Sequence, residues 1–468
     1  MTFSSVFFLF AFLPVALILY FVMPKRLRSA MLVLISLAFY AWGRPEYLAL
    51  MLFSIVFNYL SGLELGAYLT QEKHKQAKAV MLVAVVMNLL VLGFFKYYGF
   101  LIDNINALLR THIRYTELPL PIGISFYTFT ALSYIFDVYR GRAKAQKNIL
   151  SFSLYLTFFP KVISGPIVQY ADMEQQLAAR KITPDKFGAG INLFLVGLMK
   201  KVLIADNLGA AFTAIHAMDA MSAGTAWLGM IFYSLQLYFD FSGYSDMAIG
   251  LGKLFGFDID KNFDYPYCST SISEFWRRWH ISLGAWFRQY VYIPLGGNRC
   301  SAKRQAFNLS VVWLLTGIWH GASWNFVVWG LYHGAFVLLE KFVLKGRQEK
   351  LPKPVRILAT VLIVFIGWVF FFSPSLSGAL HYLGQMFGAG GMGVFDRTAW
   401  YYLGGNAILL VLAVFGSGPL VRRVHQRVFY RNGKCSVAVS VAGYVVLLLC
   451  CVAYLVSATY TSFLYFQF

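Results

Sequence analysis

Residues 314–325 have the sequence Leu-Leu-Thr-Gly-Ile-Trp-His-Gly-Ala-Ser-Trp-Asn, and they place His320 among glycines and tryptophans within a long apolar region. Histidine is the side chain whose ordinary pKa lies nearest neutrality, so it can bind and release a proton at physiological pH. A titratable side chain inside a membrane is costly to bury and is therefore a candidate for function. The stretch predicts a functional histidine if the region around it spans a membrane.

The composition indicates such a membrane protein. Of the 468 residues, 59% are hydrophobic and only 13% are charged, whereas soluble domains carry about 25% charged residues. Apolar runs long enough to cross a bilayer recur at 6–23, 80–95, 355–372 and 437–457. These runs are continuous rather than alternating, which favours helices over a β-barrel. We therefore expect an all-α polytopic membrane protein.

The net charge of +20 arises from 40 basic and 20 acidic residues. The basic residues cluster between apolar runs, as is typical of loops that face the cytoplasm and anionic lipid. We therefore expect membrane lipids rather than nucleic acid as partners, although some of this charge could also attract an anionic substrate. The clusters lie at 25–28, 73–75, 140–147, 299–304, 341–356 and 422–434.

Placing these clusters in the cytoplasm predicts twelve crossings, with both termini outside and an uncleaved first helix. Segment 149–168 is apolar but contains Pro160 and Lys161, and basic residues flank it on both sides. We expect it to be a re-entrant or broken helix. Lys200 and Lys201 make 188–206 the span that fits least well. The expected spans are 5–23, 29–42, 47–69, 79–100, 118–138, 188–206, 225–251, 306–319, 323–344, 357–372, 400–419 and 437–462.

The five cysteines predict neither a metal site nor a disulfide framework, because their number is odd and their spacing matches no metal-ligand pattern. They are Cys268, Cys300, Cys435, Cys450 and Cys451.

Two carboxylates, Asp240 and Asp246, lie within the predicted span 225–251. Isolated carboxylates in lipid are costly, so we expect both to face the protein interior and to be hydrogen-bonded or neutralised. One interpretation is a polar network that holds helices together. The other is direct handling of substrate or protons.

Segment 271–290 predicts an amphipathic helix at the inner membrane surface, with aromatic residues on one face and Arg277 and Arg278 opposite. Ser271 and Glu274 have the spacing of a capping box, and His280 falls just beside the apolar face. The segment is either an interfacial anchor or the lining of a cytoplasmic entrance, where arginines would bind a phosphate-bearing ligand.

If 307–319 rises from the cytoplasm, His320 lies about 20 Å along the helix and reaches mid-bilayer or beyond. Gly317 and Gly321 form a small-xxx-small pair that permits close approach of backbone or ligand. The alternative for His320 is a satisfied contact residue between helices. His333 is a lesser candidate, for which we expect a structural role.

These motifs resemble the membrane-bound O-acyltransferase (MBOAT) superfamily and, within it, the bacterial alginate O-acetyltransferase membrane subunit group. The resemblance extends over nearly the whole chain and is most specific across 238–334. The matching segments are 119–140, 238–261, 262–299 and 315–334, together with residues 3–5 and 12–14.

The resemblance implies that His320 is the family's near-invariant catalytic histidine and that His280 is its second conserved polar position. It implies one integral membrane domain over 1–468, with a specific core at about 118–345. The fold would be a ring of tilted helices around a central funnel or tunnel. No metal or bound cofactor is implied. Acetyl-CoA would be the cytoplasmic donor, and the acceptor an exported alginate- or cellulose-like polysaccharide.

The partners implied are a periplasmic acetyltransferase or acyl-accepting protein and a polysaccharide synthase or export complex, at the bacterial inner membrane. In the chemistry that follows, His320 deprotonates the attacking hydroxyl, and Ser323, Asn325 or a backbone N–H stabilises the oxyanion. His280 would orient the donor or relay protons, and Arg277 and Arg278 would hold donor phosphates. The alternatives are a proton-coupled transporter, with Asp240 and Asp246 in the relay, and a scaffold for polymer export.

Overall fold

The computed structural model describes residues 1–429, 434–457 and 464. Their regular structure is entirely helical, without a strand in the described part of the chain, and this confirms the all-α fold. The chain divides into two compact units. Unit 1 comprises Met1–Phe194 and Met247–Asp260, and unit 2 comprises Leu195–Asp246 and Lys261–Phe468.

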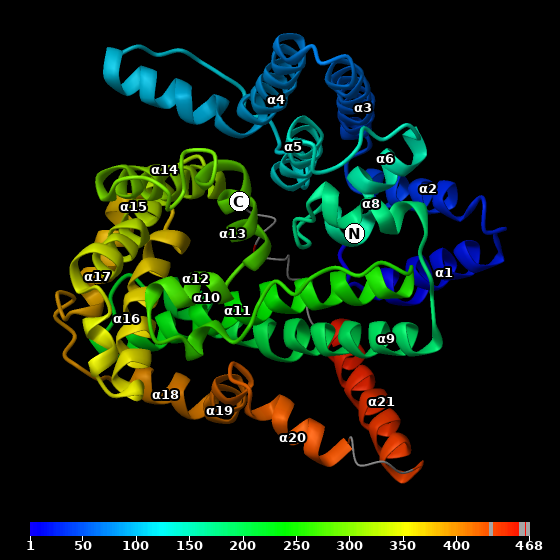
Figure 1. The fold of residues 1–468 in the computed structure, drawn as a ribbon. Helices are drawn as coiled ribbons and strands as arrows, with labels where there is room; N and C mark the ends of the chain where they lie inside the picture. The colour runs from blue at the N-terminus through cyan, green and yellow to red at the C-terminus, as the bar shows by residue number, and fades with distance from the viewer. Residues whose placement is uncertain (430–433, 458–463, 465–468) are drawn as a thin grey trace. The chain divides into compact units, whose positions relative to one another are not determined.

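Within unit 1, the long apolar helices α3 (Leu48–Thr70) and α4 (His74–Leu109) pack against each other, and α5 (Ile124–Tyr139) packs against both (Figure 1). The first part of the unit holds the shorter helices η1 (Phe8–Phe12), α1 (Leu13–Val22), α2 (Arg28–Ala41) and η2 (Pro45–Tyr47). The later part holds α8 (Tyr170–Ala178) and the start of α9 (Pro184–Met199).

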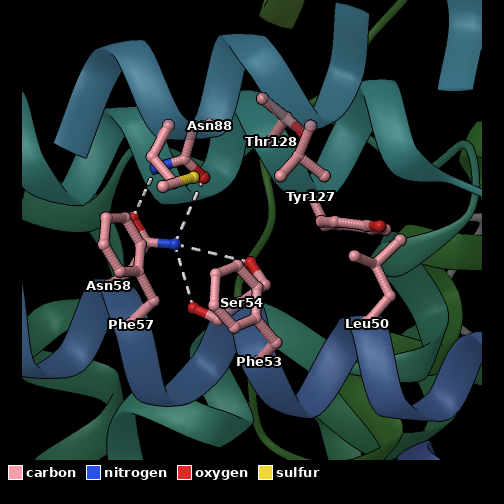
Figure 2. Close-up of a pocket in the computed structure, with 10 residues that line it drawn as sticks. Leu50, Phe53, Ser54, Phe57, Asn58, Asn88, Tyr127 and Thr128 are labelled. Carbon is pink, nitrogen blue, oxygen red and sulfur yellow. Dashed lines mark hydrogen bonds between the residues drawn. The ribbon is translucent and has the colours of Figure 1, made fainter. Parts of the chain in front are cut away.

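An amide pair joins α3 to α4. Asn58 and Asn88 are buried, and their side chains exchange hydrogen bonds of 3.2 Å and 2.8 Å. Figure 2 shows the two amides facing each other beside a small pocket that Ser54, Tyr127 and Thr128 also line. Hydrogen bonding between side chains is the way in which apolar helices bury amides, since an unpaired amide in hydrocarbon is costly.

Segment 149–168 is a broken helix, as the sequence predicts. Helix α6 (Ile149–Thr157) begins at Asn148, whose side chain accepts hydrogen bonds from the backbone N–H groups of Leu150 and Ser151. The chain turns at Phe158 into the single turn α7 (Phe159–Val162) and then continues without regular structure. Residues 152–167 are all buried, so protein shields the irregular backbone, as membrane depth requires.

Unit 2 contains helix η3 (Lys200–Ala205), which has a wider π-type turn, and α10 (Asp206–His216). It also contains most of α11 (Ala223–Leu254), whose last turns belong to unit 1. The helices that follow are η4 (Pro266–Cys268), α12 (Ile272–Arg278), α13 (Ile281–Phe287), η5 (Arg288–Tyr292), α14 (Ala302–His320), α15 (Trp324–Leu338), η6 (Leu339–Leu344), η7 (Arg347–Lys350), α16 (Lys353–Phe372), α17 (Leu376–Met386), α18 (Arg397–Gly405), α19 (Ala407–Gly416), α20 (Leu420–Phe429) and α21 (Lys434–Ser457).

Helices α14 and α15 form a tightly packed hairpin within unit 2 (Figure 1). Gly317 on α14 faces Gly330 on α15, and a Cβ atom added at Gly317 would lie 2.3 Å from the carbonyl oxygen of Phe326. The predicted small-residue contact is therefore a contact between backbones. Across the turn, a Cβ atom at Gly321 would overlap the ring of Phe326.

Among the described residues, six helical segments are long and apolar enough to cross a membrane, and a seventh is added if α18 and α19, bent by 63°, form one broken span. The protein is thus a multi-pass membrane protein. The first two expected spans, 5–23 and 29–42, are shorter apolar helices (Phe8–Val22 and Arg28–Ala41). The six are Pro45–Thr70, His74–Leu109, Pro184–His216, Trp324–Leu344, Lys353–Phe372 and Ala438–Ser457. The count of twelve crossings stays a prediction.

Candidate active site

His320 is the last residue of α14, at the closed end of the α14–α15 hairpin. The helix ends there because Gly321 adopts an extended conformation, with φ −166° and ψ 157°. The imidazole is buried, with 4% of the residue exposed. It packs edge-on against Trp329, Trp319 and Phe371, with ring centroids 4.8, 5.0 and 5.3 Å away. Aromatic walls of this kind exclude water and fix the orientation of the ring.

His280 interrupts what the sequence predicts as one amphipathic helix over 271–290, and that prediction is wrong. The residue adopts a left-handed conformation, with φ 47° and ψ 54°, which ends α12 and starts α13. His280 is not at the edge of an exposed face but is buried, with 2% exposed. Burial lowers the pKa of His280 to about 3, because desolvation disfavours the charged imidazolium.

The two predicted catalytic histidines share one neighbour, Trp319. The centroid of the His280 ring lies 6.2 Å from that of Trp319, and the centroid of the His320 ring lies 5.0 Å from it. Phe241 of α11 packs edge-on against His280 at 4.7 Å. The break between α12 and α13 and the tip of the α14–α15 hairpin therefore place two imidazoles against the same indole, in an aromatic surrounding.

Asn262, which we did not predict as a site residue, binds His280 directly. Its Oδ1 atom accepts hydrogen bonds from His280 Nδ1 at 3.2 Å and from the backbone N–H and the hydroxyl of Ser282, both at 3.0 Å. Its carbonyl oxygen accepts from the backbone N–H of Ile281, and its Nδ2 donates to Ser245 Oγ at 3.3 Å. No local pattern reveals this role, since the contacts join residues 18 to 20 positions apart.

The start of α12 is fixed by carboxylates and a hydroxyl. Ser271 Oγ accepts from the backbone N–H of Glu274 at 3.0 Å, as the capping-box spacing predicts. The reciprocal bond is displaced by one residue, since the Glu274 carboxylate accepts from the backbone N–H of Thr270. Glu340, in η6, accepts from the backbone N–H groups of Ile272 and Ser273 at 2.6 and 2.8 Å.

The two arginines of α12 differ in their surroundings. Arg278 pairs with Glu274 at 2.6 Å, and its side chain is one-third exposed. Although partial burial raises the pKa of Glu274, the hydrogen bonds from Thr270 and the charge of Arg278 lower it below its ordinary value. Arg277 is exposed and has no ion pair to any described carboxylate. It is the arginine that can bind a ligand without losing a protein contact.

Asp240 and Asp246 are neutralised by lysines, as the cost of burying a carboxylate demands. Lys201 Nζ lies 2.7 Å from Asp240 and 2.6 Å from Asp206, and Lys200 Nζ lies 2.6 Å from Asp246. The Asp240 carboxylate also accepts from the backbone N–H of Leu464. These pairs explain why two lysines occur in an apolar span, and they favour the interpretation of a network that holds helices together.

Asn325 and Ser323 lie just after His320, where α15 begins. The Nδ2 group of Asn325 donates to the carbonyl oxygen of Ser373, so this amide joins α15 to the chain that follows α16. Ser323 precedes the first residue of α15 and is partly exposed. Its hydroxyl is therefore the more accessible side-chain donor beside His320.

His333 packs inside a cage of indoles. It is fully buried, and the centroids of four tryptophan rings lie 4.8 to 6.3 Å from its own. This packing agrees with the structural role expected from the sequence. The rings are those of Trp276, Trp313, Trp329 and Trp368.

Comparison with known proteins places the chain in a family. The model of the MBOAT, membrane-bound O-acyltransferase family matches residues 45–381, which include both histidines and Asn262. The chain belongs to the MBOAT family. The protein is therefore an O-acyltransferase embedded in a membrane.

Its MBOAT relatives include proteins named for acetylation. The probable alginate O-acetylase AlgI of Azotobacter vinelandii is 44% identical over 394 residues, covering 83% of this chain and 79% of that protein. The corresponding protein of Pseudomonas aeruginosa is 43% identical over 425 residues, covering 89% and 81%. The peptidoglycan O-acetyltransferase of Helicobacter pylori is 35% identical over 428 residues, covering 83% and 80%.

Proposed function

We propose that the protein takes acetyl groups from a cytoplasmic thioester, acetyl-CoA, for the O-acetylation of a polysaccharide exported across a bacterial inner membrane. The observation that carries this proposal is the pair of buried histidines at Trp319, in a chain that belongs to an O-acyltransferase family. The names of the alginate and peptidoglycan relatives support acetyl as the acyl group.

In the proposed transfer, His320 acts as the general base. It removes the proton of the attacking hydroxyl while the hydroxyl oxygen forms a bond to the thioester carbon. The carbon–sulfur bond then breaks, and the proton passes from His320 to the departing thiolate. The buried, aromatic surrounding of His320 favours this role, because a hydrogen bond is stronger in a site that excludes water.

The remaining site residues divide by their contacts. The Nδ2 group of Asn325 already donates to Ser373, so the Ser323 hydroxyl or a backbone N–H is the better oxyanion donor. Arg277 is exposed and suits the phosphates of the donor, since guanidinium binds phosphate through two parallel hydrogen bonds. His280 contributes a second imidazole beside the same indole, and this neutral ring can accept a hydrogen bond.

The acceptor that the relatives favour is alginate or a similar polymer, with peptidoglycan as the second choice. The cellulose-like acceptor has no support from these relatives and stays a prediction from the sequence. A periplasmic acyl-accepting partner, together with a polymer synthase or export complex, would complete the transfer outside the membrane.

The alternative of a proton-coupled transporter draws less support. A relay through Asp240 and Asp246 needs carboxylates that change protonation, but Lys201 and Lys200 lie within 2.7 Å of them. These pairs join α11 to η3, which is what a network that holds helices together requires. A scaffold for polymer export would need no buried histidine pair.

Inverted membrane vesicles from cells that make the polymer test the proposal, with acetyl-CoA as the added probe. Wild-type vesicles should release free thiol, and His320→Ala should reduce the rate by about 100-fold or more. His112→Ala, at an exposed position in unit 1, is the matched control and should leave the rate unchanged. Thiol release at the wild-type rate by His320→Ala, at equal protein level, would contradict the proposed function.

A further inference from the structure

Asn262 joins the backbone and the imidazole of the His280 segment through one side-chain oxygen. The residue is almost fully buried, with 1% exposed, and it contacts three consecutive residues, His280, Ile281 and Ser282. Its Nδ2 group is directed toward Ser245 of α11. Asn262 therefore binds all three residues that follow the break between α12 and α13.

The contacts determine which way the amide points. The backbone N–H of Ser282 can only donate, so the Asn262 atom that lies 3.0 Å from it must be the oxygen. The same oxygen lies 3.2 Å from His280 Nδ1. Since an amide oxygen can only accept, Nδ1 must carry the hydrogen.

A neutral imidazole has one N–H group, so a hydrogen on Nδ1 leaves the lone pair on Nε2. Burial keeps the ring neutral near pH 7, because it lowers the pKa of His280 to about 3. The aromatic rings of Phe241 and Trp319 pack against the imidazole and limit its rotation. The ring nitrogen directed away from Asn262 is then a hydrogen-bond acceptor.

We infer that Asn262 is a positioning residue for His280, which fixes the Nδ1–H tautomer so that Nε2 accepts a hydrogen bond during acyl transfer. This inference rests on the proposed function, and it makes Nε2 of His280 an acceptor rather than a donor of a hydrogen bond. In that tautomer, Nε2 can accept a hydrogen bond from a hydroxyl or thiol, but it cannot donate a hydrogen bond to a developing oxyanion.

Three variants separate positioning from simple packing. Asn262→Leu has a similar size but lacks the acceptor oxygen, whereas Asn262→Asp keeps an oxygen for Nδ1–H. Ser282→Ala is the matched control, because it removes one of the bonds to the same oxygen and leaves the His280 bond in place. The assay is thiol release from acetyl-CoA by inverted membrane vesicles that contain the full chain at measured levels.

We expect Asn262→Leu to lower kcat by about 10- to 100-fold, as loss of a residue that orients a functional histidine does, with KM for acetyl-CoA unchanged. Asn262→Asp and Ser282→Ala should stay close to the wild-type rate. In a His280→Gln background, Asn262→Leu should cause no further loss, because both changes remove the same interaction.

The inference is overturned if Asn262→Leu turns over at the wild-type rate, or if its effect multiplies with that of His280→Gln. Should Asn262→Leu fail to reach the membrane, Asn262→Asp decides, and a loss of kcat as large as that of His280→Gln overturns the inference. His320→Ala is run in parallel. Full activity of His320→Ala defeats the proposed function, whereas an inactive His320→Ala beside a fully active Asn262→Leu defeats only the role of Asn262.

Discussion

His280 and His320 contact the same indole, with their ring centroids 6.2 Å and 5.0 Å from that of Trp319. One histidine sits at the break between two short helices, and the other ends a long helix. Each position depends on a local feature of the backbone: the left-handed conformation of His280 and the extended Gly321. The positions of the two imidazoles therefore depend on the stability of both turns.

The α14–α15 hairpin should not tolerate a side chain at Gly317. A Cβ atom there would lie 2.3 Å from the carbonyl oxygen of Phe326, so Gly317→Ala must push the helices apart, at a cost of about 1 to 3 kcal/mol. The measurement is the unfolding midpoint in detergent. Gly404→Ala is the control, since nothing lies within 4 Å of its added Cβ. Equal midpoints for the two variants would refute the close contact.

Removing one lysine of the lysine–carboxylate network should cost more stability than removing that lysine together with its carboxylate partner. Lys201→Met leaves the buried Asp240 without its cation and should destabilise the protein by about 3 to 5 kcal/mol. The double variant Lys201→Met, Asp240→Asn removes both charges and should recover much of that loss. Comparing unfolding midpoints of the single and double variants tests this. A double variant that is stable but inactive would instead favour a direct role for Asp240 in turnover.

His280 should make stability depend on pH. Above its ordinary value of about 6.5, the histidine is neutral in both the folded and the unfolded chain. Below it, the unfolded chain binds a proton, whereas the folded chain resists protonation until its pKa of about 3. Stability should therefore fall by about 1.4 kcal/mol per pH unit as the pH drops from 6.5.

The unfolding midpoint of wild type and His280→Gln, followed from pH 7.5 to pH 5, tests this dependence. The variant should lose less stability over that range. His112→Gln, at an exposed position, provides the control. An identical slope for wild type and His280→Gln would show that His280 is not buried as a neutral ring.

Substitutions at the two arginines of α12 should differ in their effect on KM for acetyl-CoA. Arg277 has no described carboxylate partner, so Arg277→Gln should raise KM for acetyl-CoA by about tenfold, the equivalent of one charge-assisted hydrogen bond, without changing kcat. Arg278 is paired with Glu274, and Arg278→Gln should chiefly lower stability. A larger KM effect from Arg278→Gln would reverse this assignment.

The apolar runs, the broken helix at 149–168 and the burial of His320 could be predicted because each depends on local composition. The break at His280 could not. The spacing of aromatic residues across 271–290 fits a single amphipathic helix. Asn262, which binds the segment at the break, precedes it in the sequence and acts through non-local hydrogen bonds.

A similar limit applies to charge. Lys200 and Lys201 weaken the hydropathy of their span when the sequence is considered alone, yet in the fold they are the partners of Asp246 and Asp240. Each lysine is unfavourable in an apolar span when considered alone. It becomes one half of an ion pair only after α11 has packed against η3. Hydropathy along the chain cannot report such a pairing.

The O-acetyl content of the exported polysaccharide tests most directly whether His320 performs acyl transfer. Cells that carry only His320→Gln should make polymer whose acetate, measured by mass spectrometry, falls to the level of a deletion strain, while the variant reaches the membrane at the wild-type amount. Polymer acetylated to the wild-type level by that variant would contradict the account.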